Sequence, residues 1–291
     1  MLFTTQGMED FISGVILFDE TIRHATQDGV PFVELLSQKG VIPGIKVDKG
    51  AKDLAGFVGE KITEGLDGLR DRLIEYRDLG AQFAKWRAVI KIGNNIPTQF
   101  CMDANAHALA RYAALCQKVG LVPIVEPEVL MDGEHDIKKC RDVTAAALKS
   151  VYSALFEHCV YLEGTLLKPN MILSGKDCPT QAGPEEVAQA TLSCFRQVIP
   201  AAVPGIVFLS GGQSSEQATE NLNAMNASGK HPWELSFSYG RALQEDALKA
   251  WKGAAANVTA SQKVFYHRAK CNGAARYGNY NREMESMPTE S

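Results

Sequence analysis

The sequence predicts an α/β fold, built as a (β/α)8-type barrel in which seven of the eight strands can be identified. Short apolar runs alternate with longer amphipathic ones, which is the order expected of repeated β-α units around a parallel sheet. The units recur about every forty residues with no linker between two halves, and eight of them typically need about 250 residues. The chain has 291 residues. A doubly wound open sheet is the structural alternative.

Seven short apolar runs are predicted to be strands. Each is bounded by turn residues and is too short for a buried helix. The runs cover residues 14–18, 44–47, 83–90, 121–129, 160–167, 205–209 and 233–238.

The stretches between these runs have helical periodicity. Residues 64–79 carry Leu66, Leu69, Leu73 and Tyr76 on one helical face, and Gly80 ends the pattern. The other predicted helices cover residues 104–119, 137–157, 184–198, 214–225 and 258–270. The pattern therefore predicts a single barrel domain over residues 1–271, followed by a flexible polar tail over residues 272–291.

Composition and charge exclude several classes of protein. The net charge is −4 with no long block of like charge, so no general nucleic-acid or anionic-membrane surface is expected. The longest apolar run, residues 198–209, contains two prolines and is too short to cross a membrane. The first ten residues lack the basic region of a signal peptide, and the seven cysteines are scattered without a C-x-x-C pair. We expect a cytoplasmic protein with reduced thiols.

Charged and polar residues gather where the predicted strands end. In the i, i+2 pairs, both side chains leave the same face of a strand. In a parallel barrel, the carboxyl ends of the strands surround one mouth, and the active sites of such folds lie there. These residues are Lys46 and Asp48, Lys85 and Arg87, Glu126 and Glu128, Lys168, Ser210, and Ser238 with Arg241.

Lysines crowded at one mouth have two interpretations. For Lys85 or Glu128 taken alone, a structural salt bridge at a strand end is the common explanation. Recurrence on successive strands favours a chemical role, because crowding and desolvation lower the pKa of an amine and make it nucleophilic. Lys168 is the best placed, since it ends an apolar run and is followed by Pro169. Its unprotonated amine would form a Schiff base with a carbonyl substrate.

Two glycine-containing turns predict a phosphate site. Residues 208–214 (FLSGGQS) form a strand end, a turn with Gly211 and a helix start, which lets backbone N–H groups approach an anion. Gly240 and Arg241 follow the next strand, and barrels usually hold phosphate in the loops after their last two strands. The acidic segment 132–136 is better explained as a helix cap than as a metal site, and the histidines share no metal-ligand spacing.

Several ordered segments together resemble one family, the class I fructose-1,6-bisphosphate aldolases, from residue 14 to about residue 270. The segment most specific to the family is LEGTLLKPNM at residues 162–171. The others are GIKVDKG at 44–50, FAKWR at 83–87, IVEPE at 124–128, FLSGGQS at 208–214 and FSYGRALQ at 237–244.

This resemblance implies a TIM barrel that reversibly cleaves fructose 1,6-bisphosphate to dihydroxyacetone phosphate and glyceraldehyde 3-phosphate in glycolysis and gluconeogenesis, with no metal or other cofactor. It also implies a cytoplasmic homotetramer whose partner is the sugar phosphate, with no nucleic-acid or membrane partner. Lys168 would be the Schiff-base lysine, Glu126 the acid/base for carbinolamine dehydration, Lys85 its charged neighbour and Glu128 a support for the charge network. The resemblance assigns the C1 phosphate to Ser210, Gly211, Gly240 and Arg241 with Ser238 nearby, and the C6-phosphate side to Lys46 and Arg87.

The sequence departs from the family at both ends. Members begin earlier, with a first barrel strand that carries an aspartate for C4-hydroxyl deprotonation, and no residue here matches that strand or the serines after it. Many members end in a functional tyrosine, whereas this chain ends in Ser291. The alternative is therefore a catalytically impaired or truncated relative that binds sugar phosphate or serves as a scaffold. A different Schiff-base lyase, such as a transaldolase or a deoxyribose-phosphate aldolase, would lack the paired phosphate loops.

Overall fold

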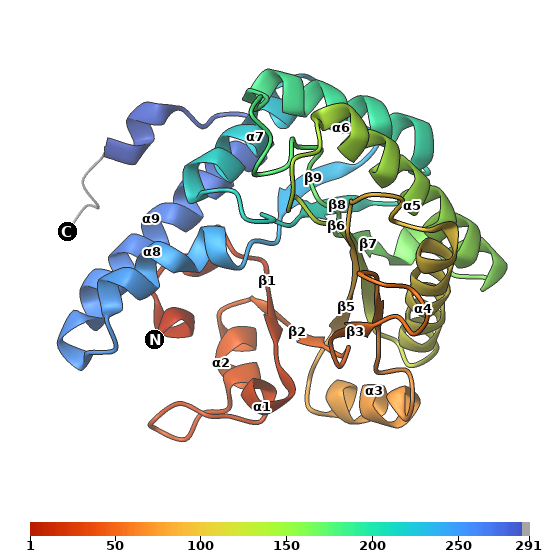
Figure 1. Ribbon diagram of the computed structural model, residues 1–291. Coiled ribbons are helices and arrows are strands. Elements are labelled where there is room, and N and C mark those ends of the chain that lie inside the picture. Colours follow the sequence, from red (N-terminus) through yellow and green to blue (C-terminus); the bar gives the residue numbers. More distant parts are fainter. Residues whose placement is uncertain (287–291) are drawn as a thin grey trace.

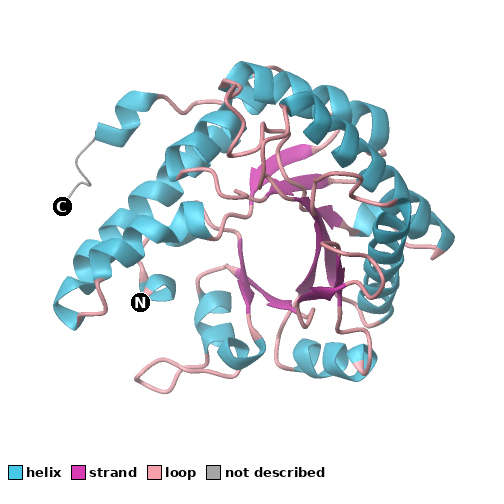
Figure 2. Ribbon diagram, viewed as in Figure 1, coloured by secondary structure: helices cyan, strands magenta, loops and turns pink. Residues whose placement is uncertain are grey.

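A parallel sheet that curls around a central axis forms the middle of the molecule (Figure 1, Figure 2). The computed structural model describes residues 1–286. Seven strands follow one another in the order β1-β2-β5-β6-β7-β8-β9, and each pairs in parallel with the next. They are β1 (Gly14–Leu17), β2 (Ile42–Lys46), β5 (Phe83–Ile90), β6 (Val122–Val129), β7 (Leu166–Leu167), β8 (Gly205–Phe208) and β9 (Glu234–Phe237). The seven predicted strands and their barrel-like arrangement are confirmed.

The pairing between strands is strongest in the middle of the sheet. β5 and β6 share eight register pairs, from Phe83 opposite Val122 to Ile90 opposite Val129. β7 has only two residues, because residues 162–164 of the predicted strand turn into a short 3-10 helix instead. Within the described residues, β1 and β9 are the two edges of the sheet. Its curl therefore has an open seam between these two strands.

Helices surround the sheet on its outer side (Figure 1). Two helices match their predicted bounds, α5 (Ile137–Glu157) and α6 (Pro184–Val198). α6 begins with proline at its first turn, and Asp136 accepts a hydrogen bond from the Lys139 amide to cap α5. The others are α1 (Asp19–Ile22), α2 (Phe32–Gln38), α3 (Leu69–Asp78), α4 (Gln99–Lys118), α7 (Ser215–Ala227), α8 (Arg241–Trp251) and α9 (Val258–Arg276).

A short antiparallel hairpin lies beside the mouth of the sheet. Its strands are β3 (Ala51–Asp53) and β4 (Lys61–Thr63), which pattern analysis did not predict. The side-chain amide of Asn105 in α4 donates to the Lys61 carbonyl oxygen at 2.9 Å, and the Thr63 hydroxyl donates to the Arg87 carbonyl oxygen at 2.7 Å. These bonds attach the hairpin to α4 and to β5.

The core lies between the sheet and the helices. Trp86 is fully buried on the outer face of β5 and stacks on Tyr112 of α4, with ring centroids 5.7 Å apart. The Tyr112 hydroxyl donates to the carbonyl oxygens of Ala84 and Ile124, at 2.6 and 3.2 Å. Because neighbouring strand residues face opposite ways, a Trp86 that faces the helices turns Lys85 and Arg87 toward the barrel axis.

The chain beyond residue 271 is more structured than the sequence indicates. Helix α9 continues to Arg276, so the predicted boundary at residue 271 falls inside a helix. It continues because Cys271, Asn272 and Ala275 are buried against its neighbours. A 3-10 helix, η5, follows over Arg282–Ser286, and the remainder of the predicted tail, residues 287–291, lies outside the described residues. None of the helices through residue 286 is both long and apolar enough for a membrane span.

Candidate active site

The carboxyl ends of the strands bring the predicted residues to one mouth of the sheet. Backbone bonds continue the sheet ladder past the strand ends: the Lys168 amide donates to the Val125 carbonyl oxygen at 2.8 Å, and the Ser238 amide donates to the Phe208 carbonyl oxygen at 2.8 Å. Side chains that follow β7 and β9 are therefore held on the same framework as those at the ends of β5 and β6.

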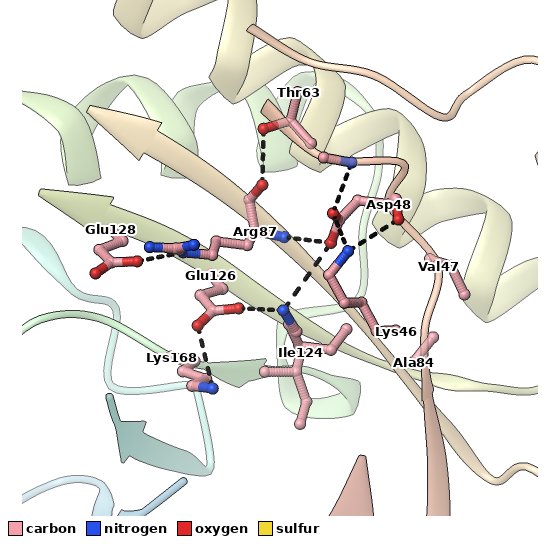
Figure 3. Close-up of polar contacts among 12 residues, drawn as sticks. Lys46, Val47, Asp48, Thr63, Ala84, Arg87, Ile124, Glu126, Glu128 and Lys168 are labelled. Atoms are coloured by element: carbon pink, nitrogen blue, oxygen red, sulfur yellow. Dashed lines mark hydrogen bonds and ion pairs between the residues drawn. The ribbon is translucent and has the colours of Figure 1, made fainter. Parts of the chain in front are cut away.

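Glu126 is paired with two lysines, Lys85 and Lys168, at this mouth, and Figure 3 shows it beside Lys168. One of its carboxylate oxygens is 2.8 Å from the Lys85 ammonium and the other is 3.1 Å from the Lys168 nitrogen. The three side chains are 4, 8 and 10% exposed, in the order Glu126, Lys85 and Lys168. The two amines therefore share one close carboxylate, which favours loss of a proton from one of them.

The amine of Lys168 loses its proton more easily than an ordinary lysine does. Its pKa is lowered, first by burial and then by the positive charge of Lys85, although the charge of Glu126 opposes the shift. An amine with a lowered pKa has a larger neutral, nucleophilic fraction at a given pH. The adjacent Glu126 is close enough to exchange protons with a group that reacts at Lys168.

Asp48 organises the side of the mouth that faces β2. Its carboxylate accepts from the Lys46 ammonium at 2.5 Å, from the Gly50 amide at 3.1 Å and from the Arg87 amide at 3.2 Å, and it is 3.9 Å from Lys85. Asp48 is predicted at this strand end but not among the site residues. The signal that would have included it is its i, i+2 spacing from Lys46 on the same face.

Arg87 and Glu128 form a second ion pair farther out on β5 and β6. Burial alone would lower the pKa of the Arg87 guanidinium. The hydrogen bond to Glu128 and its negative charge together outweigh burial and raise this pKa. The side chain of Arg87 is 41% exposed, whereas that of Glu128 is 8% exposed. Arg87 therefore remains a permanent cation at the rim of the mouth.

A cavity of about 350 Å³ opens onto these side chains. Lys46, Lys85 and Lys168 line it from one side, and Ser238 and Gly240 line it from another. Apolar side chains of β1, of β9 and of the first twelve residues complete its wall. A larger hollow of about 900 Å³ lies between α6 and α7, but none of the three lysines lines it. We place the site in the smaller cavity because it contains the reactive amines.

The two predicted anion-binding turns lie next to each other. Gly211 and Gly212 have φ angles of +60° and +95°, which a residue with a side chain rarely adopts. A Cβ atom at Gly212 would be 4.0 Å from the Arg241 guanidinium, so the loop after β8 approaches the start of α8. Within residues 1–286, Arg241 forms no ion pair with a carboxylate. Ser210, at the start of the turn, is buried.

The mouth therefore contains all the predicted site residues, in two groups. The ionic group joins Lys46, Lys85, Arg87, Glu126, Glu128 and Lys168, and the anion-binding turns carry Ser210, Gly211, Ser238, Gly240 and Arg241. The cavity connects the groups through Lys168 and Ser238.

Known proteins are similar to this chain in both sequence and fold. The family model described as fructose-bisphosphate aldolase class-I matches residues 1–291. A "Probable fructose-bisphosphate aldolase class 1" of Xanthomonas campestris pv. campestris is 60% identical over 281 residues, which are 96% of this chain and 84% of the relative. "Fructose-bisphosphate aldolase 4, cytosolic" of Arabidopsis thaliana is 56% identical, with 96% of this chain and 72% of the relative covered.

A solved structure agrees with these sequence relatives. Fructose-bisphosphate aldolase from Plasmodium falciparum, crystallised with TRAP and a small-molecule inhibitor, superposes with a TM-score of 0.95 at 49% identity. The superposition covers 96% of this chain and 81% of the other. Because the family match extends over the whole sequence and the relatives agree in fold as well as in sequence, this chain belongs to the class I fructose-bisphosphate aldolase family.

Proposed function

We propose that this protein is a Schiff-base aldolase that reversibly cleaves fructose 1,6-bisphosphate, with Lys168 as the nucleophile. The substrate follows from the family and from the names of its relatives. The observation that carries the proposal is the buried amine of Lys168, which has a lowered pKa and lies 3.1 Å from the Glu126 carboxylate. The high coverage of the relatives favours this function over a role as scaffold only.

The chemistry begins at the carbonyl carbon of the sugar. The neutral Lys168 amine attacks C2, and the carbinolamine that forms loses its hydroxyl as water to leave an iminium. Glu126 takes the proton that Lys168 loses as it becomes neutral, and gives it to this hydroxyl so that it leaves as water. The Lys85 ammonium, 2.8 Å from Glu126, stabilises the carboxylate that results.

The iminium then accepts the electrons of the bond that breaks. The C4 hydroxyl gives its proton to the Glu126 carboxylate, the C3–C4 bond cleaves with its electron pair moving toward C2, and the iminium becomes an enamine; Glu126 later returns this proton at C3. The aldehyde half leaves as glyceraldehyde 3-phosphate. A proton added at C3 regenerates the iminium, and water releases dihydroxyacetone phosphate with the free Lys168 amine.

The remaining residues hold the two phosphates. We assign the C1 phosphate to the Ser210–Gly211 turn and to Gly240 and Arg241, because these groups offer backbone N–H donors and a cation without a carboxylate partner in the described residues. Ser238 lines the cavity beside them.

The opposite side of the mouth suits the second phosphate. Lys46 and Arg87 are its partly exposed cations, and we assign them to the C6-phosphate side. Glu128 supports this group by fixing the Arg87 side chain.

Trapping tests the nucleophile directly. The protein is incubated with dihydroxyacetone phosphate, reduced with borohydride, digested and mapped by mass spectrometry. We expect the adduct on Lys168 and none in the Lys168→Arg variant, which keeps the charge but cannot form the same imine at neutral pH. An adduct confined to another lysine, or none in folded protein, would overturn the proposal. A cleavage assay with fructose 1,6-bisphosphate then tests the complete reaction.

We further propose that catalysis is independent of metal and that the protein acts as a cytoplasmic homotetramer. Cytosolic relatives and the family resemblance support this. The aromatic side chains of Phe156 and Tyr161, which are 84 and 64% exposed, support the tetramer, because exposed apolar surface is typical of contacts between chains. Cleavage should be unchanged by EDTA, and light scattering should give four chains per particle.

A further inference from the structure

A compact group of three donor side chains lies away from the catalytic mouth, where helix α9 meets the segment that follows it. His267 and Cys271 are four residues apart and share one face of α9, and Glu285 comes from η5. We propose that His267, Cys271 and Glu285 form a Zn²⁺ site that fastens η5 to helix α9. The proposal does not depend on the aldolase function, because none of the three side chains lines the cavity that contains Lys168.

The spacing of the donor atoms is close to that of a zinc site. The His267 Nε2 atom is 3.7 Å from the Cys271 Sγ atom and 3.7 Å from a Glu285 carboxylate oxygen. All three donor atoms lie within 4.8 Å of one another. Tetrahedral Zn²⁺ with bonds of about 2.0–2.3 Å separates its ligand atoms by about 3.3–3.7 Å. Small side-chain movements would therefore bring the three donors to bonding distance.

Hydrogen bonds from two neighbouring side chains fix the position of the Glu285 carboxylate. Arg268 donates two hydrogen bonds to Glu285, at 2.8 and 2.6 Å, and the Tyr280 hydroxyl donates a third at 2.8 Å. Such supporting bonds orient a metal-ligating carboxylate and reduce the side-chain freedom that binding would otherwise remove. Three of the roughly four acceptor positions of the carboxylate are used in this way, so one remains for the ion.

The charges allow a divalent cation despite the nearby arginine. With Cys271 as thiolate and Glu285 ionised, two negative charges face Zn²⁺ and Arg268, which leaves an excess of one positive charge. When Zn²⁺ binds, the S–H bond of Cys271 breaks as the Zn–S bond forms, and one proton passes to the solvent. A water molecule would complete the four ligands.

The donor set selects the kind of metal. A thiolate with an imidazole and a carboxylate suits Zn²⁺ or Co²⁺, whereas Mg²⁺ and Ca²⁺ prefer oxygen ligands alone. The sequence pattern gave no indication of this group, because the third ligand comes from a segment beyond the helix that carries the first two.

Cobalt provides the test, because a thiolate bound to Co²⁺ gives a charge-transfer absorption in the near ultraviolet. The whole chain is stripped with EDTA and titrated with Co²⁺ and then with Zn²⁺. We expect one thiolate-bound Co²⁺ per chain, displaced by Zn²⁺. The Cys271→Ser variant should lose the band, and His267→Gln should weaken Zn²⁺ binding at least tenfold. Cys159→Ser, which removes an exposed thiol, should change neither.

A second measurement tests the structural consequence. Arg282 is 83% exposed and precedes Glu285, so trypsin cleavage there reports on the attachment of η5. Zn²⁺ should slow this cleavage at least threefold in the parent and not in His267→Gln. Borohydride trapping at Lys168 should be the same in all these variants, which separates this proposal from the catalytic one. Absence of the thiolate band, or a band that survives in Cys271→Ser, would overturn it.

Discussion

The buried carboxylate of Glu126 offers the sharpest test of how the active site is held together. Replacing it with glutamine keeps the size of the side chain but removes the only charge that lies within 3.1 Å of both Lys85 and Lys168 in the described residues. Lys85 would keep only Asp48, 3.9 Å away. Two buried amines would then lack close compensation, which is costly in a site of low exposure.

The size of the effect follows from the two contacts. At an effective dielectric constant of about 20, opposite unit charges 2.8 to 3.1 Å apart attract by roughly 5 to 6 kcal/mol before desolvation is subtracted. Breaking a buried pair by removing one partner costs about 3 to 5 kcal/mol. We expect the lower value, because Lys168 can release its proton. A loss of about 3 kcal/mol lowers the midpoint of thermal unfolding by about 6 °C in a chain of this size.

The loss should depend on pH. In the folded protein the pKa of Lys168 lies below its ordinary value, and removal of Glu126 lowers it further. Between the folded and unfolded pKa values the unfolded chain binds more protons, so stability rises with pH in that window. The deficit of Glu126→Gln should shrink as the pH rises from about 7 toward the ordinary lysine pKa of about 10.4, because Lys168 then loses its charge in both folded proteins.

Thermal unfolding monitored by circular dichroism at both pH values provides the assay. Glu234→Gln is the matched control, because Glu234 pairs with Arg276 but is 74% exposed, and it should cost less than about 1 kcal/mol. A Glu126→Gln variant as stable as this control at the lower pH, or one whose deficit grows with pH, would refute the reasoning.

Three further outcomes test other parts of the structure. Borohydride trapping at Lys168 should reach half its maximal rate at a lower pH than a lysine in a peptide, because burial lowers the pKa; a half-maximum at the peptide value contradicts this. In Gly44→Ala the new Cβ would lie 2.2 Å from the Phe83 ring, so overpacking should cost about 1–3 kcal/mol in urea unfolding, whereas Gly183→Ala, with its nearest neighbour at 3.9 Å, should cost far less. Tyr112→Phe removes the hydroxyl that joins α4 to two strands and should cost about 1–2 kcal/mol; an unchanged unfolding midpoint would show that these bonds add nothing.

The parts of the fold that were predicted well have strong local signals. β5 and α6 have their predicted bounds because a short run that is apolar except for Lys85 and Arg87 on one face defines the first, and an amphipathic face with proline at its start defines the second. The hairpin of β3 and β4 was missed because its strands have three residues each and too few apolar side chains to show a period. Hydrogen bonds to partners distant in sequence hold it in place, from Asn105 to the Lys61 carbonyl oxygen and from Thr63 to the Arg87 carbonyl oxygen.

The site was predictable where strand geometry alone brings residues together. The i, i+2 pairs on β5 and β6 were expected to share one face, and Glu126 does meet Lys85 across the two strands. Asp48 was not predicted as the acceptor for two backbone amides, since the turn that carries Gly50 back toward it depends on loop geometry. The approach of Gly212 to Arg241 likewise depends on how two loops fold.

The seam between β1 and β9 is where we expect the sheet to open locally before the rest of the fold unfolds. Amide hydrogens in the middle of the sheet, where β5 and β6 share eight register pairs, should exchange with deuterated solvent only on global unfolding. β1 and β9 each pair with one neighbour only over four residues, so their amides should exchange through local opening. Because both strands line the cavity of Lys168, such opening would admit water to the buried amine. The protein would then lose the low-pKa environment of its nucleophile while most of its fold was still intact.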